Sequence, residues 1–196
     1  MKKKEGLGLL GLLLVLGLAA AAPAAAQDRG LYLGASLGTG TTSNACLNIT
    51  GACDDTDNAY KLFGGYQVSR NLAWELAYGY LGDATATGTD ALGTPVDFEI
   101  TNKALDFSGI VSLPVNERFS VFGRLGVYRS QSERRGTGVV QGGDHNGGFT
   151  WGLGLRIDLG RALAVRAEWQ QYPDIGGENP SENDVNLLTL GLVMRF

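Results

Sequence analysis

Residues 185–196 have the sequence VNLLTLGLVMRF, in which two kinds of position alternate. Counting back from Phe196 by twos gives only apolar residues, namely Met194, Leu192, Leu190 and Leu188. The residues between them form a more mixed set that includes Arg195, Gly191 and Thr189. This is the period of a β-strand, whose successive side chains point to opposite faces. The stretch therefore predicts a strand with one wholly apolar face.

Seven further segments alternate in the same way. They are residues 30–38, 59–68, 72–81, 103–113, 120–129, 149–159 and 163–172. The connections alternate too: SRN, PVNER and GR are short, whereas the links at about 39–57, 82–102, 131–147 and 173–184 are long and polar. Short links at one end and long links at the other predict an all-β fold, an eight-stranded antiparallel up-and-down barrel. Loops of such length are uncommon unless they are functional.

The composition of the two faces indicates which of them meets the solvent. The second face of the strands carries balanced charge among Gly, Ala and Ser: Lys61, Arg124, Arg156 and Arg166 against Glu75, Asp106, Asp158 and Glu168. Small residues beside ion pairs suit a narrow packed interior. Aromatic residues of the apolar face cluster near both strand ends, as in the girdles of membrane barrels. We therefore expect the apolar face to contact outer-membrane lipids; a secreted, lipocalin-like barrel, with the faces reversed, is the alternative.

The first residues differ in composition from the rest of the chain. Residues 1–26 have a basic start, a run of Leu, Gly and Ala, and small residues before Gln27, which predicts a cleaved signal peptide followed by a barrel domain at 27–196. A permanent helical anchor is the alternative. Because residues 1–26 hold three Lys and one Glu, the remainder carries a net charge of -6 instead of -4. This acidity and the lack of a basic cluster argue against a nucleic-acid partner.

The stretch AYKLFGGYQVSRNLAWELAYGYLG, with FGRLGVYR, LAVRAEWQQY and NLLTLGLVMRF, resembles the outer-membrane-protein-A-like barrels of Gram-negative bacteria. The resemblance covers roughly residues 30–196 and implies short periplasmic turns and long extracellular loops. It also implies that Phe196 belongs to the signal by which the outer-membrane assembly machinery takes up its clients. Full-length members carry a peptidoglycan-binding domain after the barrel, which we expect to be absent here.

The resemblance and the charged face together predict an ion network inside the barrel. In such barrels a Lys and a Glu of the second and third strands point inward, which here are Lys61 and Glu75. An inward base and acid of later strands correspond to Arg124 and Glu168. The alternation adds Asp106 and Arg156. For Glu75 we expect Lys61 or Arg124 as the partner.

Three other features have competing interpretations. Cys46 and Cys53 lie in the first long link, where an oxidising compartment favours a disulfide over free thiols or a metal pair. Asp54, Asp55 and Asp57 lack the spacing and closing Glu of a calcium loop and are expected to be solvated. His145 is the only histidine and lies among glycines without an obvious serine partner, so we expect neither an enzyme nor a cofactor or metal.

The sequence thus predicts a monomeric outer-membrane barrel with a structural or surface-interaction role, in adhesion or envelope integrity. Any extracellular ligand or host surface is expected to bind the long loops. A narrow porin-like channel is the alternative, but eight strands leave an interior that side chains can fill. A lipid-modifying enzyme is the third and least favoured interpretation.

Overall fold

The computed structural model describes residues 29–43, 50–89, 95–137, 142–175 and 184–196. The strands are β1 (Gly30–Thr42), β2 (Thr50–Asp54), β3 (Thr56–Ser69), β4 (Leu72–Thr89), β5 (Pro95–Pro114), β6 (Phe119–Thr137), β7 (Gly142–Asp158), β8 (Leu163–Tyr172) and β9 (Val185–Arg195). No helix that could cross a bilayer occurs in these ranges. The predicted segment 1–26 and Cys46 lie outside the described residues.

Eight of the strands close into a barrel in which all pairings are antiparallel. β1 pairs with β3 and β9, each later strand pairs with its neighbour in the chain, and β4 pairs with β5. The remaining strand, β2, pairs only with the far end of β4. Closure leaves the barrel wall without an unpaired edge, which a lipid environment requires. The all-β barrel predicted from the alternation is confirmed.

The apolar face points outward, as predicted. Exposed side chains on the wall include Leu33, Leu76, Leu125, Leu153 and Leu190, all at the predicted apolar positions. The neighbouring positions point inward and are buried. The barrel therefore presents hydrocarbon outside and polar groups inside, the reverse of a water-soluble protein.

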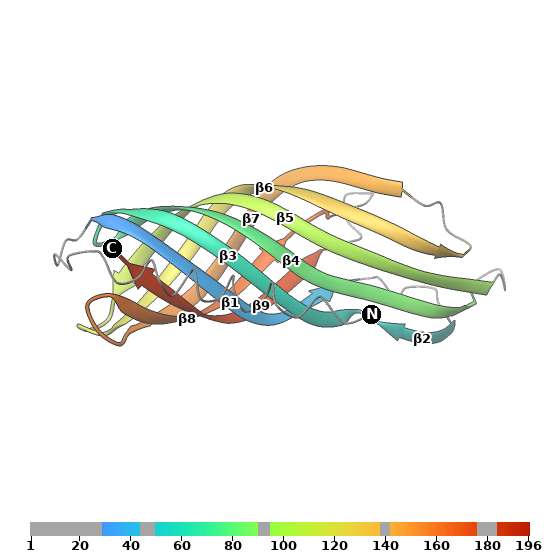
Figure 1. Cartoon of the computed structure of the whole chain (residues 1–196), viewed down its shortest axis with the longest axis horizontal. Coiled ribbons are helices and arrows are strands. Elements are labelled where there is room, and N and C mark those ends of the chain that lie inside the picture. Colours follow the sequence, from blue (N-terminus) through green and yellow to red (C-terminus); the bar gives the residue numbers. More distant parts are fainter. Residues whose placement is uncertain (1–28, 44–49, 90–94, 138–141, 176–183) are drawn as a thin grey trace, which may run out of the picture.

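Three of the four long links, expected as loops, are strands over most of their described residues. Figure 1 shows β4, β5, β6 and β7 continuing well beyond the ends of β1, β8 and β9. Residues 83–89 pair with residues 95–101, and residues 131–134 pair with residues 142–145. The sequence DATATGT at 83–89 alternates buried Ala with exposed Thr, and β-branched Thr favours strands even where the surroundings are polar. A search for apolar faces misses such strands.

A register shift separates the barrel from this extension. Between Tyr80 and Asp83 the pairing of β4 with β5 is interrupted, and Gly82 adopts φ of 96°. Glycine is the residue that takes this backbone conformation without strain. β2 lies beside the same stretch of β4, so five strand segments form an open extracellular sheet: β2 and the ends of β4, β5, β6 and β7.

Candidate functional site in the barrel interior

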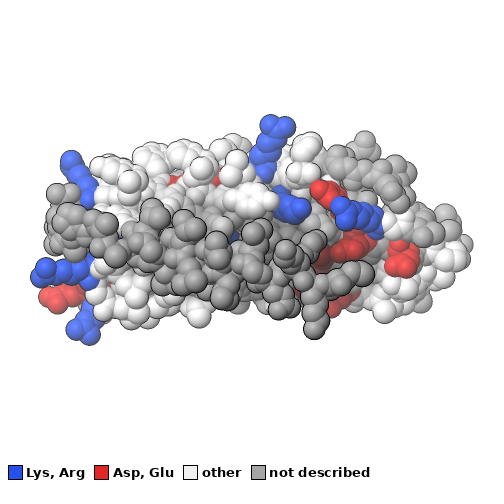
Figure 2. Space-filling view, viewed as in Figure 1, with Lys and Arg blue, Asp and Glu red and all other residues white. Residues whose placement is uncertain are grey.

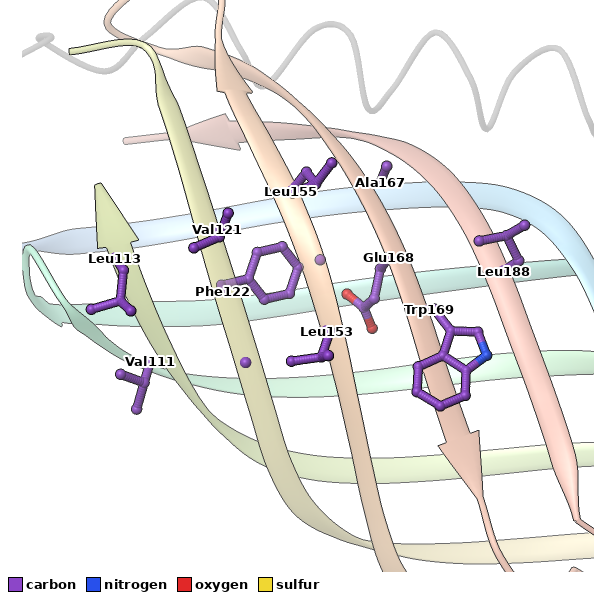
Figure 3. A pocket seen from close by; sticks show the side chains of 12 residues that line it. Val111, Leu113, Val121, Phe122, Leu153, Leu155, Ala167, Glu168, Trp169 and Leu188 are labelled. Carbon is purple, nitrogen blue, oxygen red and sulfur yellow. The ribbon is translucent and has the colours of Figure 1, made fainter. Parts of the chain in front are cut away.

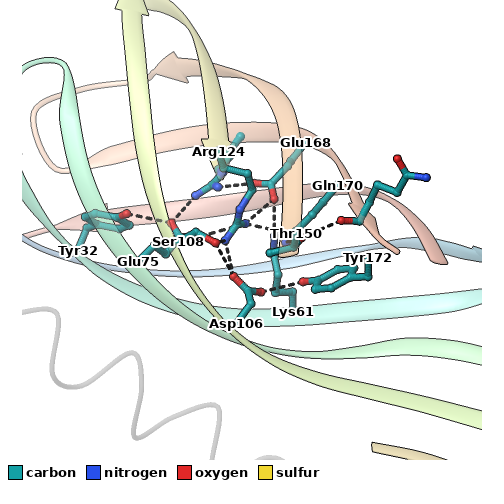
Figure 4. Close-up of polar contacts among 12 residues, drawn as sticks. Tyr32, Lys61, Glu75, Asp106, Ser108, Arg124, Thr150, Glu168, Gln170 and Tyr172 are labelled. Atoms are coloured by element: carbon teal, nitrogen blue, oxygen red, sulfur yellow. Dashed lines mark hydrogen bonds and ion pairs between the residues drawn. The ribbon is translucent and has the colours of Figure 1, made fainter. Parts of the chain in front are cut away.

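Arg124 of β6 lies at the centre of a buried ion cluster (Figure 4). Its Nη2 is 2.6 Å from Asp106 Oδ1 of β5, and its Nη1 is 2.6 Å from Glu168 Oε1 of β8. A third carboxylate oxygen, Glu75 Oε1 of β4, lies 3.4 Å from Nη1. The planar guanidinium fork thus joins acids from three different strands, a geometry that lysine cannot reproduce.

Lys61 and Arg166 complete the cluster. Lys61 Nζ of β3 lies 2.6 Å from Glu168 Oε1. Arg166 Nη1 of β8 lies 2.6 Å from Glu75 Oε2, and its Nη2 forms a second ion pair with Glu168. Of the two partners expected for Glu75, the structure places Arg124 beside it. Lys61 instead reaches across the lumen to Glu168 of β8.

Neutral side chains add further hydrogen bonds to the charged groups of the cluster. Tyr32 donates to Glu75 Oε2 at 2.9 Å, and Tyr172 donates to Asp106 Oδ2 at 2.7 Å. The amide oxygen of Gln170 accepts hydrogen bonds from both Lys61 and Arg124. Three bases face three acids, so the cluster has no net formal charge. Because charges without partners are costly to bury, this balance allows the barrel to hold six of them.

Two layers of apolar residues fill the interior, one on the periplasmic side of the cluster and one on its extracellular side. On the side of the short turns lies one group of buried residues: Tyr32, Phe63, Ala73, Ala77, Ile110, Phe122, Ala164 and Val193. On the extracellular side lies a second: Ala59, Leu81, Ala104, Tyr128, Tyr172, Ile175, Val185 and Leu187. The guanidinium of Arg166 stacks between the rings of Phe63 and Phe122, 4.8 and 4.5 Å from their centroids.

Residues that follow β8 contribute to the apolar layer on the extracellular side. Ile175, three residues past the end of β8, is buried over the extracellular mouth. Tyr128 donates a hydrogen bond to the carbonyl of Pro173, and Asn146 Nδ2 donates to the carbonyl of Asp174 at 2.6 Å. Below the cluster, a cavity of about 20 Å³ between Tyr32 and Arg166 has room for about one water molecule.

Arg156 is the one predicted network residue that lies outside the cluster. Its Nε is 3.0 Å from Asp158 Oδ1, and Asp158 also pairs with Arg195. This group lies at the periplasmic mouth and is only half-buried. Arg156 has the predicted inward direction and lies opposite Arg166 in the register, but its side chain pairs with Asp158 at the mouth instead of with the acids of the cluster.

The remaining candidates are scattered over the extracellular part. His145 is exposed on β7 and lies across from Gln131. Asp54, Asp55 and Asp57 lie around the break between β2 and β3, and within the described ranges no group of acids, histidines or cysteines could hold a metal ion. Cys53 is half-buried in β2. The disulfide stays a prediction because Cys46 lies outside the described residues.

A closed barrel with an apolar wall and a neutral, buried ionic core defines a class: this is a transmembrane β-barrel. Residues 26–196 match the OmpA-like transmembrane domain. The chain belongs to that family and is an outer-membrane protein.

Relatives of known identity agree with this assignment. The chain is 28% identical to outer membrane protein A of Klebsiella aerogenes over 192 residues and 26% identical to that of Salmonella typhi over 187 residues, in each case covering 92% of this chain and 52% of the relative. It thus spans about half the length of the curated relatives it matches. Two solved barrels share the fold: neisserial surface protein A (TM-score 0.58, 14% identity, 87% of this chain and all of that one) and the barrel domain of OprF from Pseudomonas aeruginosa (TM-score 0.54, 15% identity, 87% of this chain and all of that one).

Proposed function

We propose that this protein is a structural and surface-interaction barrel of the outer membrane and forms no permanently open channel. The observation that carries the proposal is the filled interior, in which the neutral ion cluster lies between two apolar layers. An ion entering from either side meets an apolar layer before it reaches the ion cluster. A barrel filled in this way does not conduct ions, and it can serve to anchor the extracellular sheet in the membrane.

The filled interior predicts that refolded protein shows no stepwise conductance in planar bilayers at neutral pH. Conduction would require several buried ion pairs to separate together, and each separation leaves uncompensated charges. A refolded general porin in the same bilayers provides the positive control. Long-lived, discrete openings of the pure protein would favour the narrow channel instead.

The surface-interaction role rests on the extracellular sheet. Among the described residues, the acids at this end outnumber the bases: Asp54, Asp55, Asp57, Asp83, Asp97, Glu99, Glu133, Asp174 and Asp184 against Lys103, Arg129 and Arg135. Figure 2 shows acidic side chains together with some basic ones in the right half of the molecule, whereas basic ones predominate at the left end. The extracellular end therefore suits a basic or neutral partner surface better than a polyanion.

A third solved barrel of similar fold provides a useful contrast. Ail of Yersinia pestis has been determined with the heparin analogue sucrose octasulfate (TM-score 0.53, 13% identity, 85% of this chain and 99% of that one). We predict that this protein, by contrast, is not retained on immobilised heparin at low salt and is retained on a polylysine surface. Added salt should abolish the polylysine binding. A variant with Asp97, Glu99 and Glu133 changed to the amides should bind polylysine less, and heparin retention of the unaltered protein would contradict the proposed charge preference.

We further propose that residues 1–26 direct export, that Phe196 aids recognition by the assembly machinery, and that the barrel is monomeric. Phe196 lies at the periplasmic rim, where its backbone N–H donates to the carbonyl of Leu31 at 2.9 Å. A backbone bond of this kind survives substitution of the side chain.

Phe196→Ala should therefore slow insertion in cells while barely affecting refolding into detergent. Burying one such side chain is worth only about 1.5–3 kcal/mol, and Phe196 remains 39% exposed. Pulse-chase fractionation should show periplasmic intermediates of the variant, with Leu113→Ala, another exposed apolar change near a turn, as the control. Insertion of Phe196→Ala at the normal rate would contradict the proposal that Phe196 aids recognition by the assembly machinery.

A further inference from the structure

The lipid-facing wall carries an apolar groove of about 640 Å³ across β5 to β9 (Figure 3). Its outward-facing lining includes Leu113, Val121, Leu155 and Leu188. The groove exists because two outward positions carry small residues, Gly123 on β6 and Ala167 on β8, between larger neighbours. A leucine at Gly123 would place its side chain inside the groove.

Two arginines lie beyond the periplasmic end of this groove. Arg118 lies in the turn between β5 and β6, three residues before Val121, and Arg161 lies in the turn between β7 and β8. The turns adjoin each other, since the N–H of Asp158 donates to the carbonyl of Arg118 at 2.8 Å. Both arginine side chains are exposed.

The same turns keep apolar residues at their surface. Val115 is 62% exposed beside Arg118, and Leu159 is 61% exposed beside Arg161. Apolar residues at this level indicate that the turns meet the hydrocarbon boundary, where an arginine extends its head toward the phosphate groups. The three residues from Arg118 to Val121 correspond to a rise of about 10 Å along a strand. This is roughly the distance between the acyl chain of a phospholipid and its headgroup phosphate.

We propose that this groove and its two arginines form a binding site for one anionic glycerophospholipid of the periplasmic leaflet. An acyl chain lies over Gly123 and Ala167, and the phosphodiester lies between Arg118 and Arg161. The inference does not depend on the proposed function, because it concerns the outer wall of the barrel and not its interior or its extracellular sheet.

The charge near the turns favours an anionic headgroup. Glu117 is exposed beside Arg118, and Asp158 is already paired with Arg156 and Arg195. Four arginines therefore face two acids here, and the positive charge that remains matches an anionic lipid such as phosphatidylglycerol. Phosphatidylethanolamine carries its own ammonium and gains less from two arginines. A soluble polyanion would not use the groove at all.

The test measures lipid retained by the refolded full chain in native mass spectrometry, from detergent containing equal phosphatidylglycerol and phosphatidylethanolamine. The unaltered protein should retain one lipid, chiefly phosphatidylglycerol. Each of Arg118→Gln and Arg161→Gln should weaken phosphatidylglycerol retention about fivefold, the usual effect of one basic residue at an anionic membrane surface. Arg135→Gln, at the extracellular end of β6, should have no such effect.

The groove is tested separately by Gly123→Leu. A Cβ at Gly123 would lie 3.7 Å from Leu153 Cδ2, an ordinary contact, so the variant should keep the heat-modifiable migration of a folded barrel. It should lose retention of both lipids, whereas Ala35→Leu, an outward change on β1, should retain them. Unchanged retention in Gly123→Leu or in the double arginine variant would overturn the proposal. Displacement of the lipid by inorganic phosphate alone would also overturn it, because the arginines would then bind phosphate without the groove.

Discussion

Replacing Arg124 with Met is expected to destabilise the barrel more than any other single change in the interior. Arg124 alone contacts all three acids of the cluster, Glu75, Asp106 and Glu168. Its loss leaves three buried carboxylates facing two bases. Breaking one buried pair typically costs about 3–5 kcal/mol, so the free energy of unfolding should fall by at least that range. Urea unfolding in lipid vesicles, followed by electrophoretic migration without heating, measures the change.

Two comparisons distinguish charge from packing. Arg135 lies on the same strand and pairs with Glu133 in solvent, so Arg135→Met should change stability by less than about 1 kcal/mol. Adding Asp106→Asn to Arg124→Met restores the charge balance and should recover part of the loss. An Arg124→Met variant as stable as the unaltered protein would mean that water enters the lumen and solvates the acids.

Replacing Gly154 with Val is expected to have the second largest effect. Gly154 faces the lumen on β7, and a Cβ there would overlap the ring of Phe122 and lie 2.6 Å from the carbonyl oxygen of Ala167. The ring cannot move freely because Arg166 stacks on its other side. Overpacking usually costs about 1–3 kcal/mol, and displacement of Arg166 from its acids should raise the loss to the upper end or beyond.

Gly123→Val provides the matched control for this change. Gly123 lies on the adjoining strand but faces lipid, with Leu153 Cδ2 at 3.7 Å as the nearest atom to a new Cβ. The same substitution should therefore leave the midpoint of urea unfolding close to its original value. Equal losses at Gly123 and Gly154 would show that both reflect backbone effects of valine and not the crowding of the lumen.

The crowding around Gly154 is repeated elsewhere in the lumen, which helps to explain why the sequence is rich in glycine. Inside the barrel, aromatic rings cover the glycines of neighbouring strands: Phe63 lies over Gly34, Tyr32 over Gly65, and Phe122 over Gly154. A narrow lumen can hold six charged side chains and several rings only where the adjoining positions have no side chain. The Gly-rich inner face predicted this crowding, although the ring paired with each glycine follows from the register.

Some of the ion cluster could be predicted and some could not. The inward direction of Lys61, Glu75, Asp106, Arg124 and Glu168 follows from strand alternation, and the structure brings these five together. Alternation places Arg166 on the charged face without identifying it as a cluster member, and it places Arg156 in a cluster that this residue does not reach. Tyr32 and Tyr172 have inward positions too, which is the signal that could have identified them as partners of Glu75 and Asp106.

The sequence by itself determined the fold class and the face on which each side chain lies, because the period of two in a strand is a local property of the backbone. Only the tertiary structure decided which inward groups meet. Lys61 and Glu168 are 107 residues apart and come together across the lumen at 2.6 Å. Such contacts depend on strand tilt and stagger around the whole closed barrel, which no single segment encodes. The extracellular sheet was decided in the same way, because Thr-rich segments without an apolar face become strands when a paired neighbour continues beside them.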